Sequence, residues 1–286
     1  MKTIGLIANL AKSCASDAIR RVSSLATGMG FTVFVEDRAA ALCPTERVCP
    51  ASSFSEKGVE AVVVLGGDGT MLDAAHRVVA QNLPLMGLNI GSLGYLTSVE
   101  EHQFGDALQQ LREDRCDVSL RSALSVTVVH HEGSRDVMSG ALNDVVVSRG
   151  GTGRAAELEL RLNDKQVARV LCDGIVVATP TGSTAYSLSA GGPILLPDMS
   201  AFVISMICPH TLTARPLVIR DTTRIAVRTH LSAVPMVVSL DGRDDVPLHE
   251  GDTVEIVRST RTVPLIALHG YDACDVLRRK LGWGGR

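Results

Sequence analysis

The chain has 286 residues, 45% of them hydrophobic and 21% charged, and its formal net charge of -3 at pH 7 is typical of a soluble globular protein with two modest cores. One tryptophan, three tyrosines and five phenylalanines, with no basic cluster, argue against nucleic-acid binding, and no apolar run approaches the roughly 20 residues that span a membrane. The seven cysteines are scattered without the spacing of a zinc site, so we expect reduced thiols in a cytoplasmic protein that binds neither nucleic acid nor membrane.

The first hundred residues alternate between strand-like and helix-like patterns. Runs of β-branched and aliphatic residues predict strands, and apolar residues three or four positions apart predict helices. The expected strands cover residues 3–9, 30–36, 61–65 and 84–89, and the expected helices cover residues 16–25 and 71–80. Residues 39–55, with two prolines and three serines, predict a loop. Alternation of this kind is typical of an open parallel sheet with crossover helices.

The pattern changes after a further expected helix at residues 101–114. From Cys116 to about Ala267, short runs of Val, Ile, Leu and Thr are separated by Gly, Asp and Asn, which predicts an all-β, sandwich-like domain. Strands are expected at residues 124–130, 142–147, 158–162, 175–178, 201–207, 224–228, 236–240 and 253–257. With a last helix at residues 272–282, we expect an α/β domain of residues 1–100 plus 268–286 and a β-rich domain of residues 101–267.

The most informative segment is Gly66-Gly67-Asp68-Gly69-Thr70, which follows the buried strand 61–65 and precedes the helix 71–80. Glycines let a ligand approach the backbone, and the N–H groups of the loop and of the helix start favour an anion such as phosphate. A carboxylate would repel a phosphate bound at the same loop, so its presence there requires a separate explanation. Asp68 is therefore a candidate to bind a metal ion or to accept a proton.

Two further segments combine apolar strands with polar ends. Residues 89–96, beginning with Asn89, form a second glycine loop at the carboxyl end of a parallel strand, where open α/β sheets bind their ligands. A turn that needs two glycines would look the same. Asn143 and Asp144 interrupt an apolar strand, so they lie either at a ligand or at a β-bulge. An amide beside a carboxylate suits the adjacent hydroxyls of a ribose.

The block from Asp173 to Pro193 runs from a strand into a hydroxyl-rich loop, a short helix and two glycines. Its Ser and Thr side chains offer donors and acceptors without adding charge, which suits a polar ligand. Tyr186 either lies on a base or packs in the core with a satisfied hydroxyl. His210 is either a base or, as we favour, an ordinary loop histidine, and the other histidines show no pattern.

The sequence has neither a GxxxxGK[ST] motif nor a glycine fingerprint after its first strand, which excludes a P-loop and a Rossmann dinucleotide site. The segments described above, together with residues 209–217, resemble in order the signature blocks of bacterial NAD kinases over nearly the whole chain. Lipid kinases of the diacylglycerol type share the first motif, as phosphofructokinases do loosely. The block at residues 179–193 is much more specific.

The resemblance implies an enzyme that transfers the γ-phosphoryl group of ATP to the 2′-hydroxyl of the adenosine ribose of NAD, giving NADP. It implies an α/β domain and a β-rich domain with the active site in the cleft between them, a homodimer or homotetramer, and Mg²⁺ or another divalent cation beside the triphosphate. The residues themselves leave two alternatives open. These are a lipid kinase that shares the glycine motif and a non-catalytic NAD(P)-binding regulator.

Position by position, the resemblance makes Asp68 the acceptor of the ribose proton, with Gly66, Gly67, Gly69, Thr70 and Asn89 around the nucleotides. The matching NAD-binding positions in the second half of the chain are Asn143, Asp144, Arg154, Asp173, Thr184, Ala185, Tyr186, Ser187, Leu188, Ser189 and Arg243. Three positions depart from the family pattern. Asp144 replaces a more common glutamate, Leu171 a basic or polar residue, and Arg243 a glutamine.

Overall fold

The computed structural model describes residues 1–43, 47–91, 94–97, 99–151, 155–230 and 235–283. The chain forms two compact units, each with its own hydrophobic core. Unit 1 contains Met1–Leu120 and Thr262–Arg286, and unit 2 contains Arg121–Arg261. This division differs from the expected boundaries at residues 100 and 268, because the helix after residue 101 and the last strand belong to unit 1. No helix in the described ranges is long and apolar enough to span a membrane.

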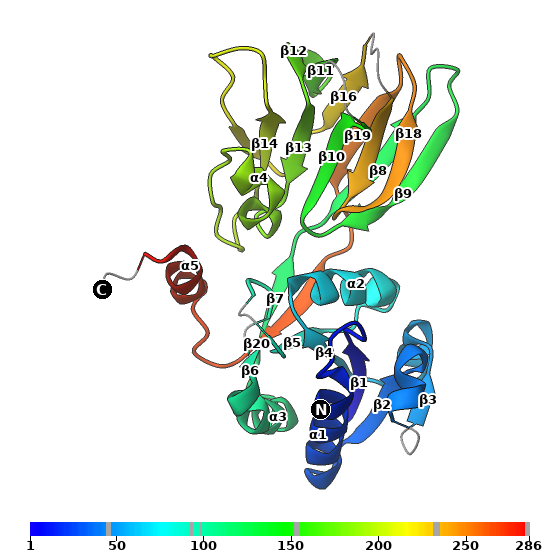
Figure 1. Cartoon of the computed structure of the whole chain (residues 1–286), viewed down its shortest axis with the longest axis vertical. Helices are drawn as coiled ribbons and strands as arrows, with labels where there is room; N and C mark the ends of the chain where they lie inside the picture. The colour runs from blue at the N-terminus through cyan, green and yellow to red at the C-terminus, as the bar shows by residue number, and fades with distance from the viewer. Residues whose placement is uncertain (44–46, 92–93, 98, 152–154, 231–234, 284–286) are drawn as a thin grey trace. The chain divides into compact units, whose positions relative to one another are not determined.

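Unit 1 is built on a largely parallel sheet of eight strands within the described residues (Figure 1). Its order is β3-β2-β1-β4-β5-β20-β7, and β6 also pairs with β5. The bounds are β1 Thr3–Ala8, β2 Thr32–Glu36, β3 Arg47–Cys49, β4 Ala61–Gly66, β5 Leu85–Asn89, β6 Val99–Glu100, β7 Asp117–Arg121 and β20 Val263–Ala267. The carboxyl ends of β1, β4 and β5 therefore lie side by side at one edge.

The helices of unit 1 are α1 Ala15–Gly28, α2 Asp68–Val78, α3 Phe104–Arg112 and α5 Ala273–Leu281. Ile19 and Val22 of α1 and Leu108 of α3 pack in one core with alternate residues of the central strands. Burial of β4 along its whole length explains its unbroken apolar sequence, since residues of opposite parity face opposite sides of the sheet.

Two expectations for unit 1 were wrong. Residues 39–55 are not one loop, because β3 pairs in parallel with β2 between the 3₁₀ segments η1 (Asp37–Leu42) and η2 (Ala51–Ser53). A strand of three residues is too short to give a periodic signal. Helix α2 begins at Asp68 instead of at residue 71, with Gly67 as its N-cap. Asp68, Gly69 and Thr70 thus form the first helical turn, and the glycine loop is only the junction at Gly66 and Gly67.

Unit 2 contains two antiparallel sheets, each of six strands in the described ranges. One has the order β15-β14-β13-β10-β17-β18, and the other has the order β12-β11-β16-β19-β8-β9. The bounds are β8 Leu124–Val129, β9 Arg135–Ala141, β10 Asp144–Arg149, β11 Ala156–Leu162, β12 Lys165–Cys172, β13 Gly174–Ala178, β14 Ala201–Ile207, β15 Leu217–Arg220, β16 Ile225–Thr229, β17 Met236–Leu240, β18 Arg243–Leu248 and β19 Thr253–Arg258.

The core of unit 2 contains side chains from both sheets, as in a β-sandwich. Strands β10 and β13 are buried on their second face as well, where Val146 and Val176 pack with Leu195. The short helix α4 (Tyr186–Ser189) contacts β13 and β14 on that side (Figure 1). The expected strand, loop and short helix of residues 173–193 are confirmed.

The strands of unit 2 that the sequence did not predict are the four sheet edges, β9, β12, β15 and β18. An edge strand is only partly covered, so it does not need a continuous apolar run, and polar residues on it discourage association with other chains. Strand β12 illustrates this, because Val167 and Leu171 are exposed among lysine, glutamine and arginine side chains.

Candidate functional site

Asp68 stands at the start of α2, where β4 ends, and its carboxylate is held in place by a neighbouring loop. Oδ2 accepts a hydrogen bond from the backbone N–H of Tyr95 at 2.9 Å, and Oδ1 accepts one from Leu96 at 2.8 Å. Each oxygen keeps unused acceptor capacity. The partly exposed carboxylate is therefore fixed in orientation but still able to receive a proton or to contact a cation.

Glycines make this arrangement possible, because other atoms already occupy the space that a side chain would need at these positions. A Cβ on Gly94 would lie 2.0 Å from Oδ1 of Asp68, and a Cβ on Gly66 would lie 2.2 Å from Oγ1 of Thr70. Both distances are far below a van der Waals contact. The motif glycines are thus explained in part by packing within unit 1, in addition to any ligand.

Tyr95 belongs to the same cluster. Its burial and the charge of Asp68 raise the pKa of the Tyr95 phenol. Lys280 of α5 places its Nζ atom 5.3 Å from the centre of the Tyr95 ring, within the range of a cation–π contact. The loop that binds Asp68 is therefore also linked to the last helix of unit 1.

A small cavity of about 300 Å³ adjoins the motif at the carboxyl ends of β1 and β2. Gly69 and Thr70 line it together with Asn9 of the segment after β1. Arg77 also lines this cavity and forms ion pairs with Glu36 and Asp73. The cavity occupies the position where open α/β sheets bind ligands.

Asn89 ends β5 and is buried, and its Oδ1 atom accepts a hydrogen bond from the N–H of Gly91 at 2.9 Å. A Cβ on Gly91 would lie 2.5 Å from Nζ of Lys12, so the ammonium group occupies that space. Lys12 was not among the expected site residues, because a single lysine after a first strand gives no signal. Asn89 and Gly91 also line a larger cavity of about 840 Å³ with Arg21 and Arg279.

In unit 2, Asn143 and Asp144 lie where β10 begins, and Asp241 fixes their backbone. The Asp241 carboxylate accepts hydrogen bonds from the N–H groups of Leu142 at 2.8 Å, Asn143 at 2.7 Å and Asp144 at 3.0 Å. Asp241 adopts a positive φ of 53° in the turn after β17. Asp241 was not among the expected site residues, although an Asp-Gly pair between two strands is a recognisable turn signal.

The hydroxyl-rich loop packs directly on the Asn143 backbone. Thr179 donates its hydroxyl to the carbonyl of Leu142 at 2.6 Å, and its N–H donates to the carbonyl of Asn143 at 2.9 Å. A Cβ on Gly182 would lie 2.0 Å from the same Asn143 carbonyl oxygen. The buried Oδ1 atom of Asn143 has no hydrogen-bond partner among the residues that the structure describes. An unsatisfied buried amide oxygen is costly, which favours a ligand donor at this point.

Asp144 is 5% exposed and close to a second carboxylate. Burial, and secondly the charge of Asp241, raise the pKa of Asp144 to about 7, although the backbone N–H of Tyr186 donates to it. The carboxyl group is thus divided between its neutral and charged forms near neutral pH. It would then respond to any hydroxyl or cation that a ligand brings.

Many hydroxyls of the block from 179 to 193 stabilise the loop itself. Ser183 donates to the carbonyl of Pro180 at 2.6 Å, Thr184 donates to that of Thr181 at 3.2 Å, and Ser187 bonds to Ser205 at 3.0 Å. These hydrogen bonds therefore largely explain why the block contains so many Ser and Thr residues. Tyr186, by contrast, is 45% exposed, which excludes a core tyrosine and leaves its ring available.

The remaining described candidates come from separate segments of unit 2, and Asp173 lies between β12 and β13. Asp173 forms an ion pair with Arg149 at 3.1 Å. Leu171 is exposed, and its carbonyl accepts the N–H of the exposed His210. Arg243 begins β18, two residues after Asp241. Arg154 lies outside the described residues.

The comparisons with known proteins all identify the same family. The model of the ATP-NAD kinase N-terminal domain matches residues 4–116, and that of the ATP-NAD kinase C-terminal domain matches residues 142–268. The chain is 36% identical over 291 residues to the NAD kinase of Syntrophotalea carbinolica, with 100% of both chains covered. It is 43% identical over 226 residues to that of Symbiobacterium thermophilum, with 78% of each covered.

Two solved structures carry the same fold. Yeast NADH kinase, crystallised with NADH, superposes with a TM-score of 0.90 at 24% identity, covering 100% of this chain and 89% of the yeast chain. An NAD kinase from Archaeoglobus fulgidus, crystallised with ATP, gives a TM-score of 0.76 at 22% identity, covering 99% and 98%. The expected combination of an α/β domain with a β-rich domain is thereby confirmed.

Proposed function

Because the chain belongs to the ATP-NAD kinase family, we propose that it transfers the γ-phosphoryl group of ATP to the 2′-hydroxyl of the adenosine ribose of NAD, producing NADP. The two family models together match most of the chain, and full-length relatives carry the name NAD kinase. The observation that carries the proposal is the carboxylate of Asp68, held by two backbone N–H groups at the start of a helix. A phosphate-binding helix start without chemistry would have no use for this anion.

Asp68 is the proposed acceptor of the proton from the 2′-hydroxyl. Phosphoryl transfer requires mainly positioning and charge stabilisation, and the proton leaves late in a loose transition state. A carboxylate of modest basicity is sufficient under those conditions. Its fixed orientation matters more, because the amides of Tyr95 and Leu96 leave the remaining lone pairs at defined positions.

The N–H groups at the start of α2 are proposed to hold the ATP phosphates, together with Gly66, Gly67, Gly69 and Thr70. Unbonded N–H groups at a helix N-terminus and the helix dipole both favour phosphate there. The cavity of about 300 Å³ beside Gly69 and Thr70 supports this assignment. Asn89 ends the neighbouring strand β5, and Lys12, in the segment after β1, supplies a positive charge beside Gly91.

The dinucleotide is proposed to bind at Asn143 and Asp144. The buried, unpartnered Oδ1 of Asn143 is an acceptor for a ribose hydroxyl, and Asp144 is a second acceptor. The exposed ring of Tyr186 offers a surface for a base. Asp173, Arg154, Arg243 and residues 184–189 are proposed contacts on the strength of the family pattern.

Mg²⁺ is the proposed divalent cation, since a hard cation bound by substrate phosphates needs only one or two protein carboxylates. The residues fit this requirement, because both oxygens of Asp68 retain acceptor capacity after their backbone bonds. The ion would neutralise charge on the triphosphate. We further propose that the enzyme is cytoplasmic and works as a homodimer or homotetramer, as the family pattern implies.

The direct test supplies the purified protein with ATP, Mg²⁺ and one acceptor at a time: NAD, NADH or dispersed diacylglycerol. Product is measured with an NADP-specific dehydrogenase, or as phosphatidate for the lipid. NADP formation that depends on both ATP and Mg²⁺ is expected. Phosphatidate as the main product would identify a lipid kinase instead, and tight NADP binding without turnover would identify a binding protein. Repeating the assay with polyphosphate in place of ATP defines the donor.

A further inference from the structure

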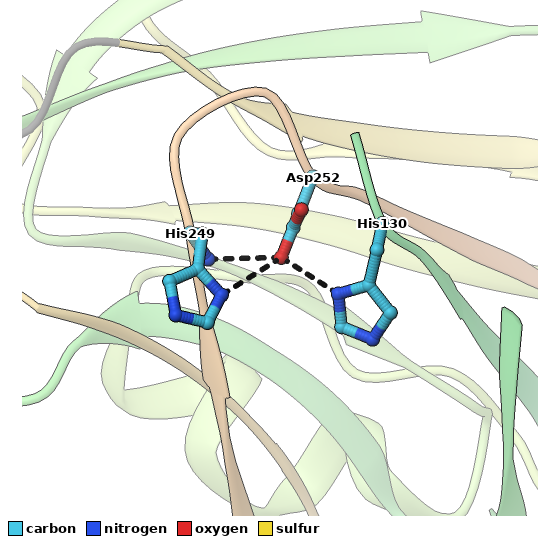
Figure 2. A group of neighbouring side chains, drawn as sticks. All are labelled: His130, His249 and Asp252. Carbon is cyan, nitrogen blue, oxygen red and sulfur yellow. Dashed lines mark hydrogen bonds and ion pairs between the residues drawn. The ribbon is translucent and has the colours of Figure 1, made fainter. Parts of the chain in front are cut away.

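A cluster of histidine and acidic side chains lies at one end of unit 2, among residues that the proposed reaction does not use. His130 directly follows β8, His249 directly follows β18, and Asp252 directly precedes β19. The antiparallel register pairs Thr253 of β19 with Val129 of β8, which brings Asp252 beside His130 (Figure 2). The cluster is therefore built by strand pairing across more than a hundred residues of sequence.

Asp252 is the centre of the cluster and is 0% exposed. Its Oδ1 accepts the N–H of His131 at 3.0 Å, and its Oδ2 accepts the N–H of His249 at 2.9 Å. The same Oδ2 lies 3.0 Å from Nδ1 of His130 and 3.7 Å from Nδ1 of His249. Two imidazole nitrogens therefore converge on one buried carboxylate oxygen (Figure 2).

The ring of His130 stands between two acceptors. Its Nε2 atom lies 3.1 Å from Oδ2 of Asp136, and its Nδ1 atom lies 3.0 Å from Oδ2 of Asp252. A neutral imidazole has a single N–H, so it satisfies only one of the two carboxylates. With Nε2–H donated to Asp136, the contact of Nδ1 with Asp252 requires a positive charge, which either a second ring proton or a metal ion at Nδ1 supplies.

We propose that His130, His249 and Asp252 bind a divalent first-row transition-metal ion, of which Zn²⁺ is the representative. Imidazole nitrogen and carboxylate oxygen are its common ligands, and three protein ligands plus water complete a tetrahedral site. Tetrahedral bonds of about 2.0 Å place neighbouring ligand atoms about 3.3 Å apart. The two nitrogen-to-oxygen separations of 3.0 and 3.7 Å bracket that value, and all three ligand atoms lie within 4.8 Å of one another.

The surroundings of His130 match those of a metal-binding histidine. Such a histidine usually donates its second N–H to a carboxylate, which fixes the ring and its tautomer. Asp136 occupies that position. His130 is 15% exposed at its side chain, whereas His249 is 73% exposed and free to complete the site.

A second combination, His131 with Glu132 and Asp252, shares the buried carboxylate. Nδ1 of His131 lies 3.5 Å from Asp252 Oδ1 and 3.2 Å from Glu132 Oε2. Both side chains are more than half exposed, and no described carboxylate holds the other ring nitrogen of His131. The set centred on His130 is favoured for that reason, and His131 serves as the matched control.

The test uses the full-length protein after removal of any purification tag and dialysis against a chelator, with Co²⁺ as a spectroscopic probe and Zn²⁺ as competitor. No nucleotide is present, so binding is independent of the kinase reaction. One Co²⁺ per chain with tetrahedral visible absorption, displaced by Zn²⁺, is expected. Zn²⁺ should also raise the unfolding temperature, because an ion that binds only the folded state stabilises it.

The variants H249Q and H130Q should abolish the tetrahedral spectrum, and H131Q should retain it. D136N should weaken binding about 10- to 100-fold, the usual cost of losing an outer partner of a ligating histidine. His249 lies exposed in a turn, so H249Q is expected to fold, and far-UV circular dichroism verifies this. Equal Co²⁺ binding by the wild type and H249Q, loss of binding in H131Q alone, or no saturable binding by the wild type would each overturn the proposal.

Discussion

The two candidate carboxylates, Asp68 in unit 1 and Asp144 in unit 2, have opposite environments. Asp68 is partly exposed at a helix start, and each of its oxygens accepts a backbone N–H. Asp144 is buried, accepts the N–H of Tyr186, and stands near the charge of Asp241, which contributes to raising its pKa to about 7. The first environment holds the carboxylate in a defined orientation, and the second makes the charge of Asp144 conditional on pH and ligand.

This difference assigns different tasks to the two groups. A proton acceptor in phosphoryl transfer must be charged and correctly oriented before the reaction. A group that binds a ribose hydroxyl can instead become charged when the ligand arrives, since hydrogen bonds to a carboxylate favour its ionised form. We therefore propose that Asp68 acts at the chemical step and that Asp144 acts in substrate binding.

The largest expected effect is that of D68N on turnover. Loss of a positioned proton acceptor should lower kcat about 10²- to 10⁴-fold. The amide retains one acceptor but turns its NH₂ group toward the N–H of Tyr95 or Leu96, so some disturbance of that loop is expected as well. Steady-state kinetics and circular dichroism measure the two effects separately. The control is D106N, an exposed acidic residue in the first turn of α3. Near-full activity in D68N would remove Asp68 from the chemical step.

D144N should change how the free energy of unfolding depends on pH. Between the ordinary pKa of 3.8 and the folded-state value of about 7, the folded chain keeps a proton that the unfolded chain releases. Stability contributed by this group therefore falls as the pH rises, by about 1.4 kcal/mol per pH unit and by no more than about 4 kcal/mol in total. Urea unfolding at pH 4 to 8 should show a flatter profile for D144N than for the wild type. Parallel profiles would contradict the raised pKa.

Substituting the glycine packed against Asp68, or the one packed against Asn143 beside Asp144, should affect stability and kinetics to an intermediate degree. The two substitutions should also differ in which kinetic parameter they change. In G94A the new Cβ would overlap Oδ1 of Asp68, and in G182A it would overlap the carbonyl oxygen of Asn143. Overpacking should destabilise each variant by about 1–3 kcal/mol. G94A should mainly lower kcat, and G182A should mainly raise the KM for NAD. G28A, where a Cβ meets no atom within 4 Å, should leave both parameters unchanged. An identical kinetic change in G94A and G182A would refute the division of tasks.

The smallest effect on stability is expected at Asp173, a third carboxylate whose charge is balanced by Arg149 at 3.1 Å. Both side chains are about one quarter exposed, so D173N should cost no more than about 1 kcal/mol. High salt should reduce even that difference. The KM for NAD should rise if Asp173 contacts the dinucleotide. An unchanged KM together with unchanged stability would leave this carboxylate without a role in binding.

Local sequence patterns predicted the central elements of the fold because those elements bury continuous or periodic apolar surface. Strand β4 and helices α1 and α3 are of this kind. Elements with little burial gave no comparable signal. Strand β3 is three residues long, and β9, β12, β15 and β18 are sheet edges. Their conformation depends on hydrogen bonds to a neighbouring strand, which no local pattern records.

The same distinction applies to the site. Asp68, Asn143 and Asp144 could be selected from the sequence, because a polar group at the end of an apolar strand is conspicuous. Lys12 gives no signal, and the Asp-Gly pair at Asp241 indicates only a turn, since their importance lies in contacts with Gly91 and with the backbone of residues 142–144. The cluster of His130, His249 and Asp252 was also missed, because its members come from separate strands.

For Gly66-Gly67-Asp68-Gly69-Thr70, the sequence by itself determined the order of strand, glycines and helix, and with it the expectation of a ligand site at a sheet edge. The tertiary structure decided that Asp68 belongs to the helix and that the amides of Tyr95 and Leu96 orient its carboxylate. The physical reason is the distance along the chain over which each kind of interaction acts. Backbone propensity and apolar periodicity act over a few residues, whereas the orientation and charge state of a side chain depend on whichever distant segments fold against it.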